Sequence, residues 1–169
     1  MGADEASLTR SQRTRLEELA ARLVLGDGFA PEAAVRLAAQ LVAEGADGEG
    51  LVELASQPAD STKLDGLEVD SLFRAALVEL GLRVPSRDAA GWTLARDVAT
   101  AIVDGVIPPA RGALRLWSLS GECGNPGVLV DMLQLHDAWE ESARSDRTAV
   151  EAEIVALAPD VIAAADREA

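Results

Sequence analysis

Apolar side chains recur every three to four residues through most of this 169-residue chain, and this spacing constrains the fold more than any other feature. It places an apolar stripe along one face of a helix and leaves the opposite face polar. Glycine and proline divide the pattern into segments, since glycine favours helix ends and proline favours the first helical turn. We therefore predict an all-α fold, a compact bundle of about eight helices.

Start and stop residues give the predicted bounds. The first helix is expected from Arg10 to Leu25, with Thr9 as N-cap and Gln12 completing a capping box. The later helices are expected to begin near Pro31, Leu51, Asp70, Ser86, Pro109 and Pro126. The last helix is expected to carry the apolar stripe of Val150, Ile154, Val155 and Ala158.

Two residue pairs carry more specific expectations. Asn125 is expected to cap the helix that Pro126 starts. Pro159 is expected to kink or break the last helix near Ala158, because proline removes a backbone donor from a helix interior.

The two halves of the chain carry the same signals in the same order. A shift of 79 positions places Leu16, Leu19, Ala20, Leu23, Val24 and Gly26 on Ala95, Val98, Ala99, Ile102, Val103 and Gly105. A shift of 78 places Pro31 on Pro109 and Leu51 on Leu129. We predict one helical domain over residues 1–169 with internal repeats at 8–83 and 86–165, each a duplicated four-helix unit. The alternative is a chance alignment of amphipathic hairpins.

The charge balance excludes several classes of partner. The chain has 15 basic and 29 acidic residues, a net charge of −14, so phosphate backbones and anionic lipids would be repelled.

No apolar run approaches the ~20 residues that span a bilayer, and the N-terminus lacks the pattern of a signal peptide. The single cysteine, Cys123, cannot form an internal disulfide. We expect a soluble cytoplasmic protein that binds neither nucleic acid nor membranes.

No catalytic constellation emerges from the sequence. Cys123 precedes a helix whose N-terminus can lower a thiol pKa. The only histidine, His136, lies about ten residues into that helix, too far along its axis to form a dyad. His136 falls on an apolar stripe, which is typical of a core histidine. Glu140 could share a metal with it, but two ligands do not make a zinc site, so we predict no metal and no cofactor.

The segment from Ala99 to Glu141 resembles a group of small acidic helical proteins of high-GC, actinobacterial bacteria. The shared pattern is an apolar helix, a Gly-x-Ile-x-Pro turn and a Gly-Ala helix with tryptophan, here Gly105, Ile107, Pro109, Gly112, Ala113 and Trp117. Arginine at fourteen of the fifteen basic positions suits such an origin. The resemblance implies an all-helical fold and a bacterial source, and no activity. The extra proline, Pro108, departs from the pattern.

These features favour a protein-binding or adaptor module, immunity-like or antitoxin-like, that presents acidic surface to a basic protein. The expected binding residues are Asp137, Trp139, Glu140 and Glu141, since an aromatic side chain among carboxylates is a plausible contact anchor. Two alternatives stay open. Trp139 can be tucked inward beside a solvated helix end, or the chain can be an enzyme or enzyme subunit with a site between its two halves.

Overall fold

The computed structural model describes residues 8–60 and 64–168. Within these ranges the chain forms eight helices and no strand, which confirms the predicted all-α class. It divides into two compact units, one ending at Pro85 and one beginning at Ser86. None of the helices described is both long enough and apolar enough to cross a bilayer.

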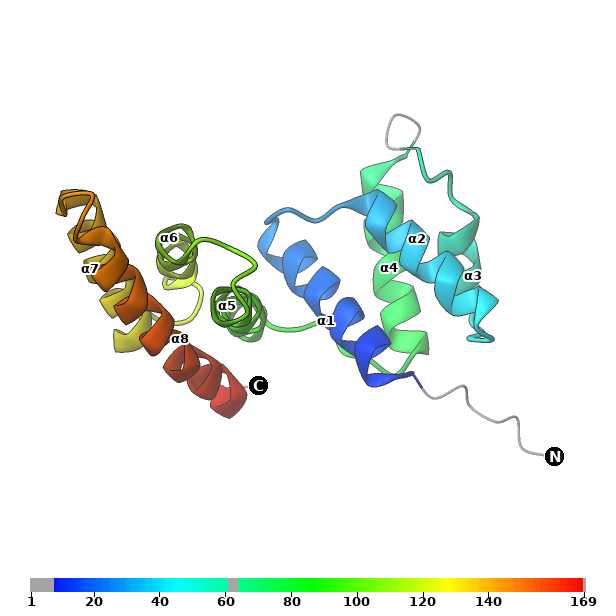
Figure 1. Ribbon diagram of the computed structural model, residues 1–169. Helices are drawn as coiled ribbons and strands as arrows, with labels where there is room; N and C mark the ends of the chain where they lie inside the picture. The colour runs from blue at the N-terminus through cyan, green and yellow to red at the C-terminus, as the bar shows by residue number, and fades with distance from the viewer. Residues whose placement is uncertain (1–7, 61–63, 169) are drawn as a thin grey trace. The chain divides into compact units, whose positions relative to one another are not determined.

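The first unit consists of α1 (Arg10–Leu25), α2 (Pro31–Ala43), α3 (Glu49–Ser56) and α4 (Gly66–Glu79) (Figure 1). Helix α3 packs against both α2 and α4, α2 also contacts α4, and α1 contacts α4. Phe73 of α4, only 1% exposed, lies in the core with Leu41 of α2 and Leu51 of α3. The apolar stripes of the four helices therefore meet in one apolar core.

Local capping sets the bounds of α1 as predicted. The Thr9 hydroxyl accepts a hydrogen bond from the backbone N–H of Gln12, and the Gln12 side chain accepts one from the backbone N–H of Thr9. Gly26 ends the helix with a φ of 67°, a left-handed conformation that glycine adopts without steric cost. Pro31 begins α2 as predicted.

The short helix α3 is capped by a side chain distant in sequence. The Glu79 carboxylate accepts hydrogen bonds from the backbone N–H groups of Gly50 (2.9 Å) and Leu51 (3.1 Å). An eight-residue helix has few internal hydrogen bonds of its own, so a carboxylate on its exposed N–H groups stabilises it and offsets its dipole. Glu79 thus ties the end of α4 to the start of α3.

We expect Glu79→Ala to lower the free energy of unfolding by about 1–2 kcal/mol, the range for losing a helix cap. Urea denaturation followed by far-UV circular dichroism measures the change. The control is Glu53→Ala, which removes an exposed carboxylate from α3 itself and should change stability by less than about 0.5 kcal/mol. Equal effects of the two substitutions would contradict the capping role.

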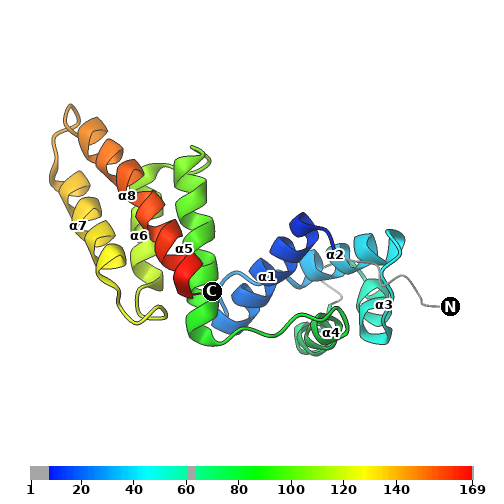
Figure 2. The same ribbon diagram turned by 90° about the horizontal axis from the view of Figure 1, so that it is seen from below.

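The second unit consists of α5 (Arg87–Val103), α6 (Pro109–Leu119), α7 (Gly127–Glu141) and α8 (Arg147–Glu168). Helix α8 packs along α5 and also contacts α6 and α7, while α6 packs against both α5 and α7 (Figure 2). Leu116 of α6, Met132 of α7 and Ile154 of α8 are fully buried. Ser86 caps α5 through its hydroxyl, as predicted.

Two predicted details of the helices are wrong, and a third is narrowed. Helix α4 begins at Gly66 rather than near Asp70, with Asp65 as N-cap. Its first turn bears Leu67, 83% exposed, so no apolar stripe marked it.

The other error and the narrowed prediction concern prolines. The N-cap of α7 is Pro126, not Asn125, which instead takes a left-handed conformation with a φ of 56°. Helix α8 continues through Pro159, so of the predicted kink or break, the break does not occur. Ala158 and Val161, on either side of that proline, are fully buried, and their packing offsets the ~3 kcal/mol that an interior proline costs.

Candidate functional site

All four predicted binding residues lie at the C-terminal end of α7. Asp137, Glu140 and Glu141 are exposed and Trp139 is half-buried. The i, i+3, i+4 spacing of the three acidic residues places them on one face of the helix. Trp139 is rotated by about 200° from Asp137, given 100° per residue. The structure therefore groups the three carboxylates, here called the α7 carboxylate patch, and points the tryptophan elsewhere.

Trp139 joins the end of α7 to the start of α8. Its indole N–H donates a hydrogen bond to Glu151 Oε1 at 3.0 Å, and the Arg147 guanidinium lies 4.2 Å from the ring centroid. Such a cation–π contact contributes about 0.5–2 kcal/mol. Trp139 thus stiffens the helix end that carries the patch. This arrangement agrees with the alternative in which Trp139 is tucked inward and does not contact a partner.

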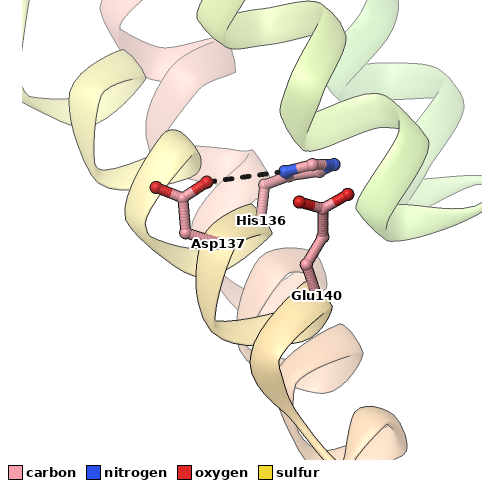
Figure 3. Close-up of side chains that lie close together, drawn as sticks. All are labelled: His136, Asp137 and Glu140. Atoms are coloured by element: carbon pink, nitrogen blue, oxygen red, sulfur yellow. Dashed lines mark ion pairs between the residues drawn. The ribbon is translucent and has the colours of Figure 1, made fainter.

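His136 is 9% exposed and lies beside the patch, so the predicted burial is confirmed. Its Nδ1 is 3.8 Å from Asp137 Oδ1 (Figure 3), which is too long for a hydrogen bond. Its ring centroid lies 6.4 Å from that of Trp139. Among the described residues, no hydrogen bond to either imidazole nitrogen is found. The side chain is 11% exposed, so solvent still reaches the imidazole.

One member of this cluster escaped the sequence analysis. His136, Asp137 and Glu140 each offer a ligand atom, and these atoms lie within 4.8 Å of one another. The sequence pairs His136 with Glu140 by the helical i, i+4 rule and overlooks Asp137, because adjacent helical residues do not share a face. The sequence His-Asp-x-x-Glu was the signal that could have indicated the third ligand. The side-chain rotamers bring the three donors together despite the different directions of their Cβ atoms.

Cys123 lies outside the patch in an environment that suppresses its reactivity. It is 6% exposed and packs under α5, since a Cβ placed on Gly91 would lie 3.0 Å from its Sγ. Burial, followed by the charges of Asp88 and Glu122, raises the pKa of the thiol to about 12. These effects outweigh the lowering of the thiol pKa by a helix N-terminus that the sequence suggested.

We expect the native thiol to react extremely slowly with Ellman's reagent at pH 8. With a pKa of about 12, roughly one thiol in ten thousand is ionised at that pH, against about a quarter for an ordinary pKa of ~8.5. Unfolding in urea should restore rapid reaction of one thiol per chain, because Cys123 is the only cysteine. Native reaction at the unfolded rate would contradict the buried, protonated state.

A cleft of about 280 Å³ lies between α1 and α2 in the first unit. Its apolar residues are Leu19, Ala33 and Leu37, and its polar residues are Arg15, Glu18, Arg36 and Gln40. The only carboxylate lining it, Glu18, is bound to Arg22 at 2.8 Å.

The structure defines an all-α protein of two helical units whose charged surface includes the α7 carboxylate patch. Comparison with protein-family models, with curated proteins and with solved structures finds no match.

Proposed function

We propose that this chain is an acidic protein-binding or adaptor module, immunity-like or antitoxin-like, that contacts a basic protein through the α7 carboxylate patch. The observation that supports this proposal best is the state of Glu140 and Glu141. Both are exposed, and no cation of the described residues pairs with either. Their full charge is available to a partner.

Rigidity and net charge add to this support. Trp139, Glu151 and Arg147 hold the end of α7 against α8, so little side-chain and backbone freedom is lost there when a partner binds. A net charge of −14 speeds the approach of a basic protein and repels acidic competitors. Carboxylates on a stiff helix end then fix the orientation of the complex.

Copurification from the native host, followed by binding measurements on the recovered protein, tests the proposal. We expect a stoichiometric basic partner whose association rate falls steeply as salt increases. The variant Asp137→Asn/Glu140→Gln/Glu141→Gln should weaken binding at least about tenfold.

The matched control neutralises three exposed carboxylates of α8 instead, Glu153→Gln/Asp160→Asn/Glu168→Gln. It removes the same charge from the same unit, so it reports the effect of net charge alone. Equal losses in the two variants would mean that the patch has no specific role. Recovery of a stoichiometric small molecule, with no protein, would refute the binding module and favour the enzyme alternative.

We also propose that the two units arose by internal duplication. Each helix contact of the first unit has a counterpart in the second under the pairing α1 with α5, α2 with α6, α3 with α7 and α4 with α8. Leu16 and Ala95 are both buried, as are Ala20 and Ala99, and Leu51 and Leu129. The pairing is imperfect, because Val155 of α8 is exposed where Leu77 of α4 is buried.

Superposition of the two units in an experimentally determined structure tests the duplication. We expect the four helix pairs to superpose in the same order and direction, with the buried positions of α1 on those of α5. A different crossing order of any pair would contradict it.

A further inference from the structure

We propose that His136, Asp137 and Glu140 form a binding site for a divalent transition-metal ion, with Zn²⁺ as the representative ion. The three ligand atoms come from neighbouring positions on α7 and lie within 4.8 Å of one another. Figure 3 shows both carboxylates next to the imidazole. The site shares Asp137 and Glu140 with the α7 carboxylate patch, but its test needs no protein partner.

The buried imidazole is the observation that distinguishes this cluster from ordinary surface carboxylates. His136 is 9% exposed, and its closest recorded acidic contact, Asp137 Oδ1 at 3.8 Å, is not a hydrogen bond. The His136 side chain is nevertheless 11% exposed, so an ion can reach the imidazole from solvent without opening the core. A metal ion placed among the three ligand atoms would bind the imidazole nitrogen and both carboxylates directly.

The geometry requires only movements that exposed side chains make readily. Ligands of a tetrahedral zinc ion stand about 3.4 Å apart, given bonds of ~2.1 Å, so the donor atoms must close from their present separation of up to 4.8 Å. His136 is fixed by its burial, whereas Asp137 and Glu140 are exposed and can rotate toward it. The histidine would act as the anchor, and water would complete the coordination.

The donor set also indicates the class of ion. One imidazole nitrogen with two carboxylate oxygens suits zinc, manganese, iron or cobalt, while calcium and magnesium prefer oxygen ligands alone. Two carboxylates would balance the charge of a divalent ion. Glu141, on the same helix end but outside the set of three donors, offers a matched carboxylate that is not a ligand.

The test uses the untagged full chain, stripped with a chelator and titrated with ZnCl₂ in a calorimeter. We expect one site with micromolar affinity. Asp137→Asn and Glu140→Gln should each weaken binding about tenfold or more, the usual range for a ligand or its immediate support. Glu141→Gln should stay within about twofold, since electrostatic screening limits the effect of a charge that does not touch the ion.

Because His136 is the only histidine, its imidazole resonances in an ¹⁵N-correlated NMR spectrum report coordination without ambiguity and without a substitution in the core. We expect them to shift with one equivalent of zinc. Three results would overturn the site: zinc binding that leaves these resonances unmoved, equal losses for Glu140→Gln and Glu141→Gln, or no binding up to about 1 mM zinc, the limit of weak association.

Discussion

Replacing Phe73 with alanine is expected to lower the free energy of unfolding of the first unit by about 3–5 kcal/mol. Phe73 is 1% exposed, and its ring lies 5.8 Å from that of Phe29 at a tilt of 40°. Truncation removes the transfer free energy of the ring, the aromatic contact and the packing of neighbours that cannot collapse fully into the space. These are the only two phenylalanines, so no other aromatic ring of this kind can compensate.

Urea denaturation of the full chain, followed by far-UV circular dichroism, measures this loss. All three tryptophans, Trp92, Trp117 and Trp139, lie in the second unit, so tryptophan fluorescence reports that unit separately. The control is Val78→Ala, an apolar truncation on the same helix at a side chain that is 68% exposed; it should cost less than about 0.5 kcal/mol. A loss below about 1 kcal/mol for Phe73→Ala would contradict its place in the core.

Replacing Gly112 with valine is expected to destabilise the second unit by about 1–3 kcal/mol through overpacking. A Cβ built on Gly112 would lie 2.6 Å from Ile102 Cδ1 and 3.1 Å from Ile107 Cδ1, and it would overlap Ile102 Cγ1. Ile102 is 2% exposed, so it cannot swing into solvent. The absence of a side chain at Gly112 lets α6 approach α5 closely.

The control for this prediction is Gly127→Val, the same exchange at a glycine of α7 where a Cβ meets nothing within 4 Å. It should change the midpoint of the fluorescence transition little. Shortening Ile102 should relieve the clash, so Gly112→Val/Ile102→Ala should lose less stability than the two single substitutions combined. Additive losses would show that the two side chains do not compete for the same space.

The contacts at the candidate site could be predicted from the sequence less well than the helices could. The spacing of Asp137, Glu140 and Glu141 suffices to place three carboxylates on one face. It does not reveal that Trp139 is held by Glu151 and Arg147, because those contacts cross a turn between two helices. For Cys123, local position suggested a lowered pKa, yet the packing of the loop under Gly91 of α5 raises it.

The sequence by itself determined the helical class and the helix ends that rest on neighbouring residues. These helix ends can be identified without knowing the fold, because each depends on local interactions. Capping hydrogen bonds to nearby backbone groups involve Thr9, Gln12 and Ser86, whereas a φ preference of the residue itself acts at Gly26 and Pro31. Tertiary structure alone decided the rest. Helix α8 passes through Pro159 because buried packing on both sides of the proline outweighs one lost hydrogen bond. His136 lies beside Asp137 and Glu140 without a hydrogen bond to them because the packing of α7 fixes the position of its ring. Burial and contacts between helices depend on the whole chain, and local sequence does not specify them.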